Sequence, residues 1–217
     1  MGRRAGCADT SCVNSSSRPV RRHRKFVLTL FLTLLWVGPT GARDSHRVLR
    51  VVDGDTAVLD DGEVVRILSI DTPERGESLY HEASVFLAEC VEGREVSLEF
   101  GGRRRDSYHR LLGHVWVGDT LVSEKLLEAG MARLYPFADD TVHLQRLASA
   151  QKRARESRCG IWQAPPPEPC SVYVIHPKSH RFHRPTCRSA RTLTLRTTLS
   201  RDALLDSGLA ACRNCRP

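Results

Sequence analysis

The sequence predicts an α+β fold that is mainly β, a small barrel of short strands followed by a separate cysteine-rich tail. Short apolar and β-branched runs alternate with turn residues between positions 46 and 135. A helical segment interrupts these strands after the third of them. A proline run then precedes a tail that holds four of the eight cysteines.

The first three strands are expected at residues 46–52, 56–59 and 64–70. The Asp-Gly pair at 61–62 supplies the positive φ that a tight hairpin turn needs. Residues 79–91 then change to a helical period, because their apolar side chains recur on one face.

The second half repeats this alternation of strands and helices. Strands are expected at residues 96–100, 111–117 and 132–135, the second with a bulge or bend at Gly113. Helices are expected at 121–129 and after Asp139 or Asp140, either of which could cap the last one. This order suits a Greek-key barrel of the OB type, although other α+β folds share it.

Charge is distributed unevenly along the chain, whose net charge is +8. Residues 43–168 carry 17 basic and 22 acidic residues, whereas residues 169–217 carry nine and two. By charge alone, only the tail resembles a nucleic-acid-binding surface, and a solvated basic surface without a partner would look the same.

The proline-rich stretch at 164–169 is expected to be a stiff linker between a domain at 43–163 and a module at 170–217. A module of this size cannot bury a sufficient core alone. We therefore expect it to be stabilised by a metal or by disulfides.

The N-terminus has the pattern of an export signal. A basic stretch at 21–25 precedes an apolar run at 26–37, and small residues at Thr40 and Ala42 suit cleavage after Ala42. The apolar run is short for a membrane span, so an uncleaved anchor is the weaker alternative. We expect an exported protein, whether secreted, periplasmic or at the cell surface, with no stable membrane partner if the signal is cleaved.

Three short segments carry acidic and arginine side chains: 52–56, 66–74 and 106–113. Asp55 follows a glycine in the first hairpin, and Asp71 lies at the end of the third strand, where the two can meet. Two carboxylates with a backbone carbonyl form a hard-oxygen site that suits calcium. Arg66 and Arg110 can grip a phosphate, and Glu74 remains free to deprotonate water. A cation, an anion clamp and a base are the parts that phosphodiester hydrolysis needs.

The order of these motifs resembles the thermonuclease family, also called staphylococcal-nuclease-like. The matching segments are Val-Asp-Gly-Asp-Thr at 52–56, Arg66 with Asp-Thr-Pro-Glu at 71–74, Glu-Ala-Ser at 82–84, Asp-x-Tyr-x-Arg at 106–110, Glu-Ala-Gly-Met-Ala at 128–132 and Gly-Ile-Trp at 160–162. The resemblance implies a five-stranded OB barrel with three helices, which cleaves DNA and RNA with little sequence preference and leaves 3′-phosphorylated products.

The resemblance also implies roles for individual residues. Asp55, Asp71 and the Thr72 carbonyl would bind Ca²⁺. Glu74 would activate water, and Arg66 and Arg110 would bind the scissile phosphate. Tyr108 and Tyr135 are candidates for substrate contact, although Tyr135 could equally fill the end of the barrel.

The tail contains an H-x3-C and a C-x2-C pair, formed by His183, Cys187, Cys212 and Cys215. Four such ligands in two close pairs suit a tetrahedral Zn²⁺ site. The segment also resembles the small cysteine modules similar to the metal-binding domain of the Ada DNA-repair protein. A disulfide from Cys187 to one of the other two cysteines is the alternative, and Cys90 could pair with Cys159.

Together these observations predict an exported, monomeric, calcium-dependent nuclease with a nucleic acid substrate. The competing interpretation is a non-catalytic OB-fold module that binds nucleic acid or protein. The complete acidic and arginine set favours the enzyme, because a binding module has no need of a buried acidic metal site.

Overall fold

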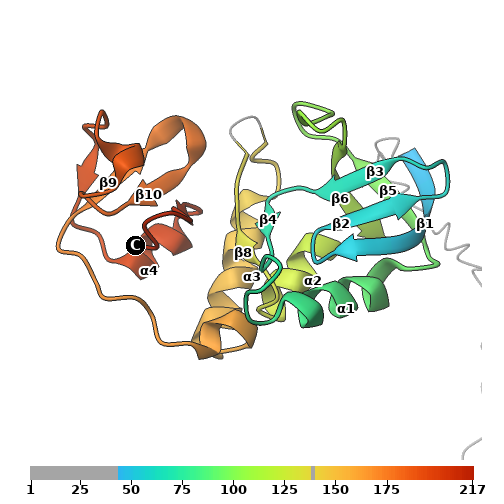
Figure 1. The fold of residues 1–217 in the computed structure, drawn as a ribbon, viewed down its shortest axis with the longest axis horizontal. Helices are drawn as coiled ribbons and strands as arrows, with labels where there is room; N and C mark the ends of the chain where they lie inside the picture. The colour runs from blue at the N-terminus through green and yellow to red at the C-terminus, as the bar shows by residue number, and fades with distance from the viewer. Residues whose placement is uncertain (1–43, 138–139) are drawn as a thin grey trace, which may run out of the picture. The chain divides into compact units, whose positions relative to one another are not determined.

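The computed structural model describes residues 44–137 and 140–217, and Figure 1 shows their fold. The expected export signal at residues 1–42 lies outside the described residues, as does Asp139. No helix in the described part of the chain is both long and apolar enough to cross a membrane.

Five strands close into a barrel, as the resemblance implied. They are β1 (Asp44–Asp53), β2 (Thr56–Leu59), β3 (Val64–Ile67), β5 (Glu95–Glu99) and β6 (Leu111–Val117). They pair in the order β3-β2-β1-β5-β6, and a parallel pairing of β3 with β6 closes the ring. A short strand β7 (Thr120–Leu121) pairs antiparallel with the end of β6.

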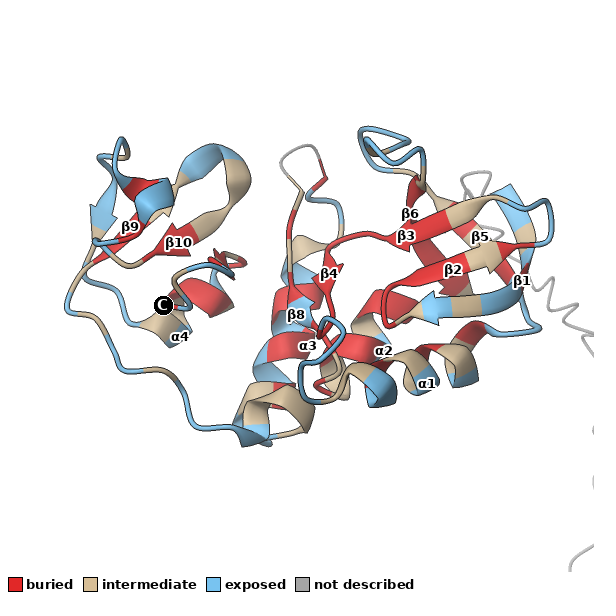
Figure 2. Cartoon of the chain, viewed as in Figure 1, coloured by how far each residue is buried: buried red, intermediate tan, exposed pale blue. Residues whose placement is uncertain are grey.

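Three helices pack beside the barrel: α1 (Tyr80–Val91), α2 (Val122–Glu128) and α3 (Leu144–Glu156). Their apolar faces supply Leu87, Leu126 and Leu147, all fully buried in the same core as the strands. Figure 2 shows the buried residues gathered on the strands and on the helix faces that meet them. The core therefore holds the ends of β2, β3 and α1 in fixed positions.

The third expected strand is interrupted after Ile67. Ser69 adopts a positive φ of 62°, which turns the chain before β4 (Ile70–Asp71). β4 leaves the barrel sheet and pairs with β8 (Arg133–Leu134). This turn matters for the site because it sets the direction in which Asp71 enters it.

Two local expectations are wrong. Gly113 pairs in register with Ile67, and the register shifts of the barrel lie in β1, at Val48–Arg50 and Val51–Asp53. Asp140 does not cap α3, whose N-cap is His143. Asp140 instead lies 2.8 Å from the buried His114. Burial raises the pKa of Asp140, but the His114 contact, together with hydrogen bonds from Val142 and Ser69, holds the pKa below its ordinary value.

The tail forms a small unit with its own sheet, after residues 165–170, which have no regular secondary structure. Its elements are β9 (Tyr173–His176), β10 (Arg181–His183), β11 (Arg196–Thr197), α4 (Arg201–Asp206) and β12 (Ala210–Ala211). The strands pair in the order β11-β9-β10-β12. Tyr173 and Phe182 fill one small core together with two leucines of α4.

Candidate active site

Asp55 is positioned by the tight turn between β1 and β2. The turn lies so close to its neighbours that a Cβ on Gly54 would be 2.8 Å from the Thr72 Cβ and 2.9 Å from the Ala83 Cβ. Only glycine fits there without displacing a neighbour. The Asp53 carboxylate accepts a hydrogen bond from the Asp55 backbone at 3.1 Å and fixes the turn from the other side.

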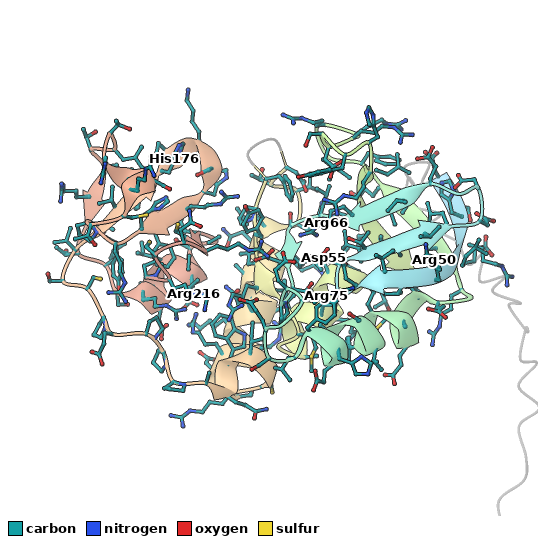
Figure 3. All side chains as sticks on the ribbon, viewed as in Figure 1. Arg50, Asp55, Arg66, Arg75, His176 and Arg216 are labelled. Atoms are coloured by element: carbon teal, nitrogen blue, oxygen red, sulfur yellow. The ribbon has the colours of Figure 1, made fainter. Side chains whose placement is uncertain are left out.

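Arg66 connects the two buried carboxylates. Its Nη2 lies 2.9 Å from the Asp55 Oδ2 and 4.0 Å from the Asp71 Oδ1. The same guanidinium donates to the backbone carbonyls of Ile67 and Ile70, so the turn after β3 wraps around it. Figure 3 labels Asp55 and Arg66 near one another beside the ends of β2 and β3.

Thr72 packs directly against Asp55. Its backbone N–H and its hydroxyl lie 3.4 Å and 3.2 Å from the Asp55 Oδ2. Asp55, Arg66, Asp71 and Thr72 are each less than 10% exposed. Four of the expected site residues therefore form one buried polar cluster, which we call the Asp55–Asp71 cluster.

Burial dominates the electrostatics of this cluster. Removal from water raises the pKa of Asp55, and the Arg66 charge opposes that shift without cancelling it. Burial likewise raises the pKa of Asp71, against the opposing charge of Arg213. Because burial disfavours an ionised carboxylate, both groups gain if a cation binds beside them.

Arg110 reaches the cluster through Thr56. The Thr56 hydroxyl donates to the Asp55 Oδ1 at 3.0 Å and accepts from the Arg110 Nη1 at 3.4 Å. Asp106 holds the other side of the guanidinium, with the Arg110 Nε 2.8 Å from its Oδ2. Tyr108 is 79% exposed, and its ring centroid lies 5.6 Å from the guanidinium carbon of Arg110.

Glu74 is exposed, and among the described residues its link to the cluster is Arg213 of the tail. The Arg213 Nε lies 2.5 Å from the Asp71 Oδ2, and its Nη2 lies 3.1 Å from the Glu74 Oε1. A second tail arginine, Arg216, pairs with Glu77 at 2.8 Å.

Arg213 is the residue that sequence reasoning missed. It lies between Cys212 and Cys215, so the C-x2-C motif marked its neighbours, but no pattern connected it with the Asp71 carboxylate 142 positions away. Tyr135, at the end of β8, is also in contact with the tail, because the guanidinium carbon of Arg181 lies 4.1 Å from its ring centroid.

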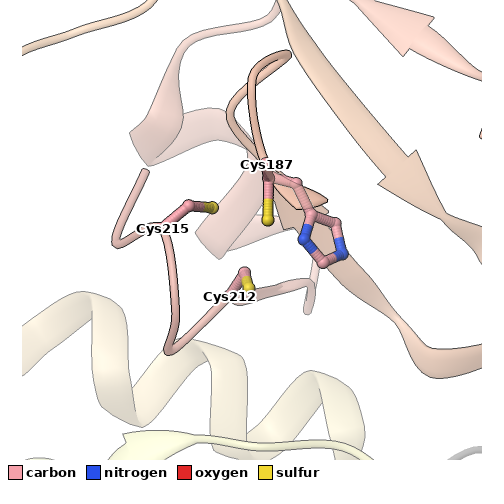
Figure 4. Close-up of side chains that lie close together, drawn as sticks. Cys187, Cys212 and Cys215 are labelled. Atoms are coloured by element: carbon pink, nitrogen blue, oxygen red, sulfur yellow. The ribbon is translucent and has the colours of Figure 1, made fainter. Parts of the chain in front are cut away.

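The tail brings together the expected Cys/His cluster. The ligand atoms of His183, Cys187, Cys212 and Cys215 all lie within 4.8 Å of one another, and Figure 4 shows the three cysteine sulfurs directed toward a common point. The six cysteines among the described residues are free thiols, so neither disulfide alternative is formed.

The donor atoms of this cluster are only partly satisfied within the described residues. Both ring nitrogens of the buried His183 are without a hydrogen-bond partner there. Burial, with further contributions from Cys187 and Cys212, raises the pKa of Cys215 to about 12. Three adjacent thiols and an unpaired imidazole form a donor set that a soft cation would satisfy.

Comparison with known proteins shows to which family the barrel is similar. The family model for staphylococcal nuclease homologues matches residues 64–164. The thermonuclease of Staphylococcus hyicus is 33% identical over 127 residues, which cover 54% of this chain and 75% of the relative. The chain belongs to the staphylococcal nuclease family.

Other relatives agree with this assignment. The thermonuclease of Staphylococcus intermedius is 33% identical over 129 residues, or 55% of this chain and 77% of the relative. An uncharacterized endonuclease of Escherichia coli is 32% identical over 152 residues, or 67% and 94%. The chain is therefore a nuclease that hydrolyses phosphodiester bonds.

Proposed function

We propose that this nuclease is calcium-dependent and cleaves DNA or RNA with little sequence preference at the Asp55–Asp71 cluster. The observation that carries the proposal is the pair of buried aspartates brought together around Arg66, with Arg213 of the tail as a further partner of Asp71. Two adjacent buried carboxylates supply hard oxygen donors, and such donors favour calcium over softer metals.

Asp55, Asp71 and the Thr72 carbonyl would hold the calcium ion. The fit is supported by the raised pKa of both aspartates and by the contact of Thr72 with Asp55. When bound there, calcium would supply positive charge next to the phosphate that is being attacked.

The remaining roles fall to three side chains of the barrel. Arg66 and Arg110 bind the scissile phosphate and stabilise its added negative charge, since a planar guanidinium can donate two parallel hydrogen bonds to phosphate oxygens. Glu74 accepts a proton from the attacking water, and its exposure leaves it accessible to solvent. Tyr108, beside Arg110 and exposed, contacts the substrate.

The tail would bind one zinc ion through His183, Cys187, Cys212 and Cys215. Support comes from their mutual proximity and from the unpartnered imidazole. Elemental analysis of the purified protein should find one zinc per chain, lost in Cys212→Ser. A metal-free wild-type protein with unchanged folding of the tail would contradict the assignment.

We further propose that the chain is exported as a monomer after removal of residues 1–42. In this arrangement, residues 43–163 form the nuclease domain, 164–169 the linker and 170–217 the zinc module. The signal-like composition of the N-terminal segment supports export. N-terminal sequencing of the exported protein should begin at residue 43.

The catalytic proposal is tested by digestion of single-stranded DNA with calcium, with calcium plus excess chelator, and with Glu74→Gln in calcium. Glu89→Gln is the matched control, because Glu89 is an exposed glutamate of α1 away from the cluster. Cleavage should require calcium and fall by roughly two to four orders of magnitude in Glu74→Gln only. DNA binding without calcium-dependent cleavage would favour the binding-module interpretation instead.

A further inference from the structure

A pocket of about 300 Å³ lies between Tyr135 and the tail. Tyr135 is the barrel residue in its lining, and the tail contributes several polar side chains, among them Arg181, Arg213 and Asn214. Two further lining residues, His183 and Cys212, belong to the proposed zinc site, whereas the roles described above leave Arg181, Arg213 and Asn214 unused. The pocket thus offers an aromatic ring, two guanidinium groups and an amide within one concave surface.

The charge of Arg181 has no anionic partner in the part of the chain that the structure describes. Its guanidinium carbon lies 4.1 Å from the Tyr135 ring centroid. Among the described residues it has no carboxylate partner, and its Nε is buried without a hydrogen-bond partner. A half-buried guanidinium loses much of its hydration, so an anionic ligand in the pocket would restore both charge balance and hydrogen bonds.

Arg213 connects this pocket with the proposed catalytic carboxylates. It lines the pocket while it donates to Asp71 and Glu74. Its guanidinium carbon also lies 6.0 Å from the Tyr135 ring centroid. A polynucleotide whose scissile phosphate lies at the Asp55–Asp71 cluster would therefore have an adjoining nucleotide at the pocket.

We propose that this pocket is a substrate subsite, which binds one unstacked nucleotide next to the scissile phosphate. The proposal rests on the nuclease function assigned above and adds the tail to its substrate cleft. Arg181 binds the phosphate of that nucleotide, and Tyr135 and Asn214 contact its base. Arg213 exchanges a carboxylate oxygen for a phosphate oxygen as the strand enters.

The chemistry of the lining favours single-stranded nucleic acid over duplex. An aromatic ring next to arginines is the combination by which proteins hold unstacked bases without strong sequence preference. A base that remains stacked in a duplex cannot enter a pocket of this size between two parts of the protein. Single-stranded substrates should therefore gain more from the pocket than duplexes do.

The test compares Arg181→Ala with Arg191→Ala in the full chain. Arg191 is an exposed tail arginine outside the pocket, so its removal changes the net charge equally. Cleavage is measured on a single-stranded oligothymidylate and on bis(p-nitrophenyl) phosphate, a phosphodiester without nucleotides. Binding of the fluorescently labelled oligothymidylate is measured separately by anisotropy, with calcium replaced by chelator.

Arg181→Ala should raise KM and Kd for the oligonucleotide roughly tenfold, with kcat and the bis(p-nitrophenyl) phosphate rate kept within about twofold. Arg191→Ala should match the wild type. Equal behaviour of the two variants, or faster oligonucleotide cleavage by Arg181→Ala, would overturn the subsite. If the wild type cleaves neither substrate, the nuclease assignment at this cluster fails, while the anisotropy values still decide whether the pocket binds a nucleotide.

Discussion

Asp55 and Asp71 are both removed from water, and the barrel supplies one arginine to balance the two of them. Arg66 lies closer to Asp55 than to Asp71, and Arg213 of the tail completes the contacts of Asp71. Burial still raises the pKa of each carboxyl. Residues in this state bind a cation readily, because the cation relieves a cost that folding has imposed.

The raised pKa values predict a pH dependence. Folding favours the protonated carboxyls, so their stabilising effect on the metal-free protein is fully present below the ordinary value of 3.8 and is lost as pH rises through the raised values. Calcium binds the ionised carboxylates, so it should raise Tm at neutral pH. This increase in Tm should be lost as the pH falls through the raised pKa values, which lie above the ordinary 3.8. Thermal unfolding with and without calcium measures this. A calcium increment that persists unchanged at about pH 4 would contradict it.

The sequence predicts those residues of the site that lie within local motifs. Asp55, Arg66, Asp71 and Thr72 lie at strand ends, and strand ends of a small barrel bring polar side chains together. The tail arginines could not be predicted in this way. Arg213 depends on how a separate small unit contacts the barrel, which no periodicity or turn signal encodes.

At the scale of elements, the turn between β1 and β2 determines whether Asp55 reaches the cluster. A Cβ added at Gly54 would lie closer to Thr72 and Ala83 than normal contact distance allows. The turn therefore couples the barrel to α1 and to the segment that follows β4. A side chain at position 54 would therefore displace the turn itself, α1 or the segment that follows β4.

Gly54→Ala should destabilise the protein by roughly 1–3 kcal/mol through overpacking and weaken calcium binding by displacing Asp55. Gly113→Ala is the control, because a Cβ there would meet its nearest neighbour at an ordinary 3.6 Å. Urea unfolding and calcium titration measure both effects. The account of this turn is wrong if both variants lose the same stability, or if Gly54→Ala keeps wild-type calcium affinity.

Most elements could be predicted from periodicity and turn residues, because the strands of the barrel are short and bounded by Gly or Asp. The break between β3 and β4 could not, since it depends on a positive φ at Ser69, a residue that is not glycine. The prediction of the N-cap of α3 was wrong for a different reason. Asp140 has the right side chain for a cap, but the buried His114 offers it a stronger partner.

At the scale of the whole molecule, a basic tail adjoins an acidic nuclease domain. Phosphate contacts dominate non-specific affinity for nucleic acid and make it dependent on salt. The tail would thus supply the attraction that the domain itself lacks. Arg213, which pairs with Asp71 and Glu74, and Arg181, which lies beside Tyr135, both belong to this tail.

Removal of residues 169–217 should weaken DNA binding and flatten its dependence on salt concentration, because nine basic residues are lost. The rate at saturating DNA should survive, since Arg66, Glu74 and Arg110 remain. Affinity and turnover are measured across a series of salt concentrations. Loss of the saturating rate in a truncated protein that still shows a cooperative unfolding transition would contradict this division of roles.

The central claim is that the Asp55–Asp71 cluster holds the calcium ion of this nuclease. Anomalous diffraction from crystals grown in calcium tests it most directly. The account predicts a calcium peak between the Asp55 and Asp71 carboxylates, beside the Thr72 carbonyl, that is absent from Asp71→Asn crystals. A peak found instead at the exposed group of His46, Asp60 and Asp61, with Arg213 still paired to Asp71 at saturating calcium, would contradict it.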